Sequence, residues 1–132
     1  MPRVLVVEDS VSMRAFVRSA LEADGTELGE IEVIEASSGF DALRLLPRGP
    51  YDLVITDINM PHINGLELVQ FIRSSEQHRG TPVLLISTQS SARDRERGLT
   101  LGADAYLTKP FSPETLRAAA AAHLAKGARQ PS

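Results

Sequence analysis

The sequence predicts an α/β fold, a doubly wound five-stranded parallel sheet with strand order 2-1-3-4-5 and five helices. Five short β-like runs alternate with helix-like segments, which is typical of a parallel sheet covered by helices on both faces. The first, third and fourth runs are continuously apolar, as strands buried on both faces are. The second and fifth runs carry polar residues, and the order 2-1-3-4-5 has these two strands at its edges.

The β-like runs are short, and their pattern of apolar and polar residues differs between the central and the edge strands. Glu32 and Glu35 interrupt the second run, and the fifth run alternates apolar residues with Asp104, Tyr106 and Thr108. Open α/β sheets bind ligands beyond the carboxyl ends of the strands where the order reverses, which here is between strands 1 and 3. We expect strands at residues 4–7, 31–36, 53–56, 83–86 and 103–108.

The intervening segments have helical patterns. Pro47 closes the second helix. Ser112 can cap the last helix, Pro113 suits its first position, and Glu114 favours the positive end of the helix dipole. We expect helices at residues 10–22, 39–46, 65–74 and 92–101, and a fifth after Ser112. The first has an apolar stripe made of Val11, Met13, Phe16, Val17, Ala20 and Leu21.

Length and composition indicate one soluble domain, because 132 residues with 42% hydrophobic and 23% charged content suffice for an ordinary core. The absence of cysteine excludes disulfides, thiolate catalysis and cysteine metal sites. A net charge of −3 argues against binding nucleic acid or anionic lipid through charge, and the apolar runs are too short to cross a membrane. We expect a cytoplasmic monomer without a signal peptide, with a domain at residues 1–126 and a flexible tail or linker start at residues 127–132.

Five polar residues follow the predicted strands at the carboxyl end of the sheet. Glu8 and Asp9 follow strand 1 and Asp57 follows strand 3, so their mutual repulsion calls for a cation. Oxygen ligands with open positions suit Mg²⁺. Ser87 after strand 4 is a hydroxyl donor, and Lys109 after strand 5 is a compact positive charge. Together they predict a phosphoryl site, where a carboxylate attacks phosphorus while the metal and the lysine neutralise its oxygens.

Each residue has a simpler explanation when it is taken alone, such as helix capping by Glu8 and Asp9, a turn at Asp57, or a solvated Lys109. Their joint placement at the strand ends of one sheet favours the site. Other polar residues give weaker evidence of function. The alternating charges that include Arg93, Arg95 and Arg97 are typical of a solvated helix face, with a docking surface as the minority interpretation. The histidines, His62, His78 and His123, are too scattered for a metal cluster.

Several motifs resemble the response-regulator receiver domains, and the CheY-like single-domain regulators are closest in layout. The resemblance extends from about residue 3 to about residue 124, and the motifs together are far more specific than any one alone. They are VLVVEDS at residues 4–10, DLVITDINMP at 52–61, NGLE at 64–67, LIS at 85–87 and GADAYLTKPF at 102–111.

The resemblance implies that Asp57 accepts a phosphoryl group from a partner histidine kinase. Asp9 and Asp57 would hold Mg²⁺ with the backbone carbonyl of Asn59, and Glu8 would act directly or through water. Ser87 and Lys109 would bind the phosphoryl oxygens. The chain would then be a phosphoacceptor switch and not an enzyme in the ordinary sense, performing only its own phosphorylation and dephosphorylation.

The resemblance also implies an output. Tyr106 would turn inward as Ser87 shifts, altering the face of the fourth helix, fifth strand and fifth helix for an unknown target protein. It implies a cis peptide bond between Lys109 and Pro110. Thr88 departs from the usual alanine or glycine. Thr88 and the neutral amides of Asn59 and Gln89 together predict an intermediate phosphoryl lifetime.

Three alternative functions fit less well. An aspartyl phosphatase needs a second acid two residues after Asp57, where this chain has Asn59. A flavin carrier needs a phosphate loop after strand 1, where Glu8 and Asp9 would repel phosphate. A degenerate receiver would lack part of the acidic, hydroxyl and lysine set. The pathway stays open, with chemotaxis-like control, sporulation or relay roles looking alike.

Overall fold

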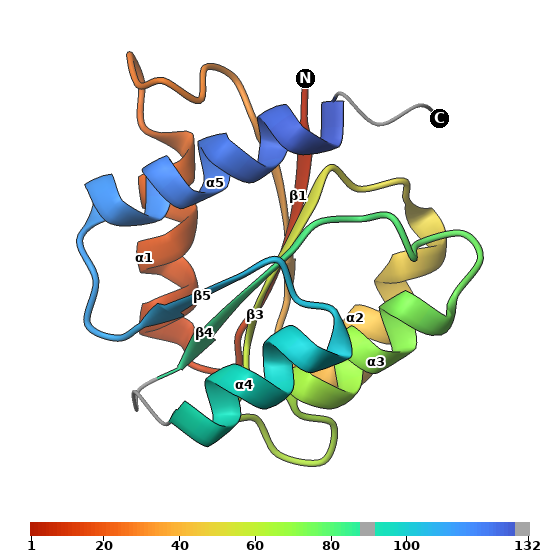
Figure 1. Ribbon diagram of the computed structural model, residues 1–132. Helices are drawn as coiled ribbons and strands as arrows, with labels where there is room; N and C mark the ends of the chain where they lie inside the picture. Colours follow the sequence, from red (N-terminus) through yellow and green to blue (C-terminus); the bar gives the residue numbers. More distant parts are fainter. Residues whose placement is uncertain (88–91, 129–132) are drawn as a thin grey trace.

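The five predicted strands form one parallel sheet in the computed structural model, which describes residues 1–87 and 92–128. The observed order β2-β1-β3-β4-β5 confirms the predicted topology (Figure 1). Neighbouring strands all pair in parallel. The strands are β1 (Arg3–Val7), β2 (Glu32–Ala36), β3 (Leu53–Asp57), β4 (Val83–Ser87) and β5 (Ala105–Thr108).

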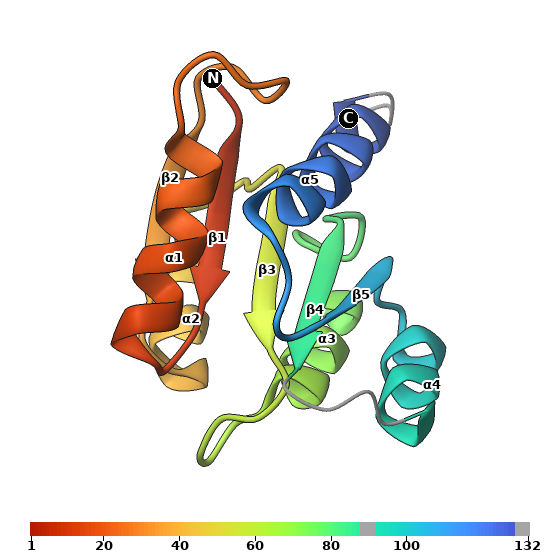
Figure 2. The same ribbon diagram turned by 90° about the vertical axis from the view of Figure 1, so that its left-hand side faces the viewer.

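Five helices cover the two faces of the sheet. Helices α1 and α5 lie on one face, and α2, α3 and α4 lie on the other (Figures 1 and 2). A single 3-10 turn at Leu46–Arg48 follows α2, so Pro47 ends the α-helix as predicted. The helices are α1 (Val11–Glu22), α2 (Gly39–Leu45), α3 (Gly65–Ser74), α4 (Ala92–Leu101) and α5 (Pro113–Ala128).

The central strands contribute side chains to two hydrophobic clusters, one on each face of the sheet. On β1, Val4 and Val6 pack on the side of α1 and α5, whereas Leu5 and Val7 pack on the side of α2 and α3. All four are fully buried. This two-sided burial explains the continuous apolar runs, because alternate residues of a strand point to opposite faces.

The first helix differs from its predicted apolar stripe. Val17, Ala20 and Leu21 are buried, but Val11 is 72% exposed and Phe16 is 36% exposed. Val11 is the first residue of α1 and follows the turn that leaves β1, so it lies beyond the end of the sheet. Phe16 packs edge-on against Phe111, with ring centroids 5.9 Å apart.

Some predictions fall outside the described residues, namely those for Thr88, for Gln89 and for most of the tail at residues 127–132. Helix α5 runs through Ala128 and so includes the first two residues of that segment. Lys109–Pro110 is a cis peptide, as expected, and Gly49–Pro50 is a second one that was not predicted. No helix in the described part of the chain is long and apolar enough to cross a membrane.

Candidate functional site

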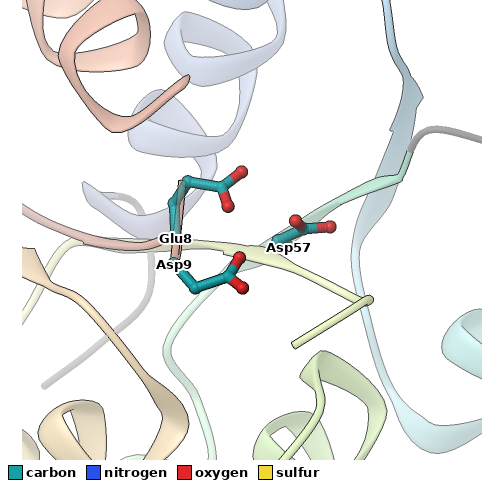
Figure 3. Close-up of side chains that lie close together, drawn as sticks. All are labelled: Glu8, Asp9 and Asp57. Atoms are coloured by element: carbon teal, nitrogen blue, oxygen red, sulfur yellow. The ribbon is translucent and has the colours of Figure 1, made fainter. Parts of the chain in front are cut away.

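Three carboxylates meet at the carboxyl end of the sheet. Glu8 and Asp9 directly follow β1, and Asp57 is the last residue of the adjacent β3. Each offers one oxygen, and the three oxygens lie within 4.8 Å of one another (Figure 3). Glu8 is fully buried and Asp57 is 4% exposed, whereas Asp9 is exposed. The site therefore has a buried floor with one carboxylate open to solvent.

Lys109 reaches into this cluster from the end of β5. Its Nζ donates to Glu8 Oε1 at 2.9 Å and to Asp57 Oδ2 at 3.1 Å. Burial by itself lowers the pKa of Lys109, but the hydrogen bonds to these two carboxylates outweigh it and raise the pKa above its usual value. The ammonium is therefore charged at neutral pH, and it links the end of β5 to the ends of the neighbouring strands β1 and β3.

The cluster retains an excess of negative charge, because one ammonium faces three carboxyl groups. Asp9 is exposed as a whole residue, but partial burial of its carboxyl group raises its pKa, and its hydrogen bond to Glu8 and the charge of Glu8 raise it further. The three oxygens are hard ligands of the kind that Mg²⁺ prefers, and the exposed side leaves room for its waters. The residues present thus fit a magnesium ion.

The loop after β3 brings an amide to the site, and the end of β4 brings a hydroxyl. The backbone N–H of Asn59 donates to Asp57 Oδ1 at 3.2 Å, which fixes the orientation of that carboxylate. The Asn59 side chain donates from Nδ2 to Ser87 Oγ, also at 3.2 Å. Ser87 is fully buried at the end of β4. All the residues predicted to bind metal or phosphoryl oxygens therefore lie together.

A close backbone contact holds this loop in place. A Cβ at Gly65 would lie 2.3 Å from the carbonyl oxygen of Asp57 and 2.8 Å from Ile58 Cα, so only glycine fits there. Asn64 caps α3 by accepting from the Glu67 N–H at 2.9 Å, and the Glu67 side chain accepts from the Asn64 N–H at 3.0 Å. We predicted Gly65 only as a helix start, because sequence spacing does not reveal a tertiary contact.

Arg14 is a residue of the site that the sequence did not indicate. Its Nη1 donates to the backbone carbonyl oxygen of Glu8 at 2.7 Å. The side chain comes from the fourth residue of α1. The side chain of an arginine on a helix that starts beside the site can adopt many orientations. No sequence pattern predicts that Arg14 turns towards the Glu8 carbonyl.

The other predicted residues lie around the site or away from it. Tyr106 is half-buried on β5, in register with Leu85 of β4 and packed against the larger hydrophobic cluster. Among the described residues, no other set of three or more histidine, aspartate or glutamate side chains could share a metal, so the histidines form no cluster. His62 is exposed as expected, whereas His78 is only 3% exposed despite its polar sequence context.

Comparison with known proteins gives one consistent result. Residues 4–121 match the model of a family described as the response regulator receiver domain. A chemotaxis protein CheY homolog of Campylobacter jejuni is 35% identical over 116 residues, which are 87% of this chain and 86% of that protein. A probable transcriptional regulatory protein of Picosynechococcus is 43% identical over 117 residues, which are 83% of this chain but 44% of that protein.

The solved structures agree with the sequence comparison. The structure of the chemotaxis protein CheY4 of Vibrio cholerae superimposes with a TM-score of 0.82 at 37% identity. The match covers 91% of this chain and 96% of the other. The family match over residues 4–121 spans all five strands, including the four whose ends form the site.

Proposed function

This chain belongs to the response-regulator receiver domain family, a class of phosphoacceptor switches in two-component signalling, and we propose that Asp57 is its phosphoacceptor. The observation that carries the proposal is the contact between Lys109 and the buried Asp57 carboxylate within the acidic cluster. Asp57 is the last residue of the central strand β3, and its carboxylate is aligned by the Asn59 N–H. Asp9 is exposed, and Glu8 is fully buried, so Asp57 combines access with orientation.

The chemistry is a phosphoryl transfer from the phosphohistidine of a kinase. An oxygen of Asp57 attacks phosphorus, the new O–P bond forms as the P–N bond breaks, and the imidazole nitrogen leaves with the bonding electron pair. Lys109 already contacts Asp57 and can follow the transferred oxygens. The Ser87 hydroxyl accepts a hydrogen bond from the Asn59 side chain, and its own O–H can donate to another of these oxygens.

A magnesium ion, when bound, would supply the charge neutralisation that one lysine cannot provide. Asp9 and Asp57 would hold it, together with the backbone carbonyl of Asn59, and Glu8 would contribute directly or through water. The fit of three clustered carboxylate oxygens supports this assignment. We place the reaction in the cytoplasm with a histidine kinase as donor.

We further propose that phosphorylation changes protein binding at the face formed by α4, β5 and α5. Tyr106 is half-buried next to Leu85 on the strand that ends in Ser87, so a shift of that strand end can reach the ring. Within α4 the only buried residue is Gly98, so few apolar contacts resist a small movement of the helix. The name of the Campylobacter relative favours a chemotaxis-type target.

Incubation with Mg²⁺ and acetyl phosphate, followed by intact mass measurement, tests the acceptor. The wild type is expected to gain one phosphoryl group, and Asp57→Asn, or removal of Mg²⁺, is expected to abolish the gain. Asp52→Asn is the matched control, because Asp52 lies just before β3 at its opposite end and accepts from the Arg3 N–H. A Mg²⁺-dependent gain that persists in Asp57→Asn would exclude Asp57.

Backbone amide shifts test the output. Beryllofluoride, which imitates a phosphoryl group, is expected to move the amides of Tyr106 and of α4 as well as those of the site. Changes restricted to the loops around the acidic cluster would exclude the proposed face.

A further inference from the structure

The guanidinium group of Arg14 binds the turn after β1, which carries Glu8 and Asp9. Arg14 donates from Nη1 to the carbonyl oxygen of Glu8 at 2.7 Å and from Nε to Glu35 Oε1 at 3.1 Å. Its side chain is 18% exposed, so both bonds form away from most of the solvent. One planar group thus connects the turn after β1 to the edge strand β2.

The carbonyl that Arg14 binds belongs to the peptide unit that joins Glu8 to Asp9. The orientation of this unit sets where both carboxylates point, because the two side chains leave from its two ends. Two more hydrogen bonds hold the same turn: the Glu8 N–H donates to the Ala36 carbonyl at 3.0 Å, and the Ser10 N–H donates to Glu8 Oε2 at 3.0 Å. Without Arg14, the Glu8 carbonyl would lose its charged donor and the peptide could tilt.

Glu35 keeps Arg14 in this orientation. It lies on β2 immediately before Ala36, the residue that receives the Glu8 N–H, so both anchors of the turn come from adjacent residues. Arg18 binds the other oxygen of Glu35 and also pairs with Glu22 at 3.1 Å. Glu35 therefore has both oxygens engaged and little freedom to release Arg14.

We propose that Arg14, oriented by Glu35, is a positioning residue that aligns the Glu8 and Asp9 carboxylates for Mg²⁺. The inference rests on the proposed function. Arg14 touches neither the metal ligand oxygens nor the acceptor, and acts through the Glu8–Asp9 peptide. Groups that orient metal ligands in this way typically contribute tenfold or more to metal affinity.

The direction of the effect separates positioning from a simple charge effect. Arg14 is a cation behind a cation site, so loss of its charge alone would tighten Mg²⁺ binding. Loss of alignment weakens binding instead. Arg14→Met removes both donors and keeps much of the side-chain volume, so it sets these two effects against each other.

The test is a Mg²⁺ titration of the full chain, followed by backbone amide shifts. Arg14→Met is expected to weaken Mg²⁺ binding by about tenfold or more. Arg18→Met is the matched control, since it removes a cation from the same network but leaves both bonds of Arg14 in place, and it is expected to lose clearly less Mg²⁺ affinity than Arg14→Met. Unchanged or tighter binding by Arg14→Met, or an equal loss in Arg18→Met, would overturn the proposal.

Phosphorylation kinetics give a second readout that a purely structural role would not move. In Arg14→Met, the Mg²⁺ concentration that gives half the maximal rate with acetyl phosphate is expected to rise, while the rate at saturating Mg²⁺ returns towards wild type. A rate that stays low at saturating Mg²⁺ contradicts the proposal. Failure of the wild type to bind Mg²⁺ or to be phosphorylated would instead remove the proposed function itself.

Two milder variants decide the matter if Arg14→Met does not fold. Arg14→Lys keeps the charge but cannot make both bonds, and Glu35→Gln keeps an acceptor but loses the charge that orients Arg14. Both are expected to weaken Mg²⁺ binding, with urea unfolding in EDTA used to confirm that the chains are folded. Wild-type affinity in both variants would overturn the proposal.

Discussion

Replacement of Lys109 by methionine is expected to destabilise the metal-free protein and to make its stability depend more strongly on Mg²⁺. Methionine keeps the apolar stem of the side chain and removes the ammonium. The remaining carboxylates of Glu8 and Asp57 are 0% and 5% exposed, so water cannot replace the lost donor fully. The variant therefore leaves two buried negative charges, with the exposed Asp9 beside them, and no counter-ion among the described residues.

The size of the effect follows from the two contacts. At separations of 2.9 and 3.1 Å, each ion pair is worth about 5 to 6 kcal/mol at an effective dielectric constant of about 20, before desolvation. Desolvation of Lys109 cancels much of this, and loss of one partner of a buried pair usually costs about 3 to 5 kcal/mol. The pKa of Lys109 is raised in the folded state, so its contribution is fully present at neutral pH and is lost only as pH rises through the folded-state value. We expect a loss of about 3 kcal/mol at neutral pH.

Urea unfolding followed by circular dichroism measures this, because the chain has no tryptophan to report by fluorescence. In EDTA, Lys109→Met should unfold at lower urea than wild type, and Mg²⁺ should restore more stability to the variant than it adds to wild type. Arg95→Met is the control, since Arg95 is exposed on α4 and forms no ion pair with any described residue. Wild-type stability of the variant in EDTA, or an equal gain from Mg²⁺ in both, would refute this account of the cluster.

Two further predictions concern backbone packing and pH. Gly65→Ala would place a methyl group against the Asp57 carbonyl, so the variant is expected to lose about 1 to 3 kcal/mol of stability in urea unfolding. Its phosphorylation, followed by intact mass, is expected to be slower than the fraction of unfolded protein alone would explain. Burial lowers the pKa of His78 below its usual 6.5, so the neutral ring stabilises the fold above that pH and stability falls as pH drops through the lowered value. His78→Gln should therefore lose less stability than wild type between about pH 7.5 and 5 in urea unfolding.

Each of these two predictions has a matched comparison. Gly98→Ala also introduces a close contact, but with the end of the flexible Leu85 side chain, so it should leave phosphorylation intact. Equal rates of phosphorylation of Gly65→Ala and Gly98→Ala would contradict the role of Gly65 in positioning the loop after Asp57. Substitution of the exposed His62 by Gln should leave the pH dependence as in wild type. An unchanged dependence in His78→Gln would show that another group causes it.

The strand order and the location of the site could be predicted from the sequence because both depend on local patterns. A strand such as β3 that is buried on both faces must be apolar throughout, and parallel strands bring their carboxyl ends to one edge. Glu8, Asp57 and Lys109 were therefore predicted to meet, although they are as many as 101 residues apart.

Contacts that depend on how elements pack could not be predicted. The apolar pattern of α1 does not show that its first residue, Val11, lies beyond the sheet. Similarly, the polar neighbours of His78 hide a ring that packs near Gly49. The sequence marks Glu35 only as a polar residue of an edge strand, whereas its ion pair with Arg14 depends on how α1 packs against β2.

The most direct measurement of the central claim locates the phosphoryl group within the chain. After phosphorylation by acetyl phosphate and Mg²⁺, borohydride reduces an aspartyl phosphate to homoserine, and fragmentation of the peptides by tandem mass spectrometry identifies the modified position. The account predicts homoserine at position 57 and unmodified aspartate at position 9. Reduction at position 9 or at any other acid, with Asp57 intact, would contradict it.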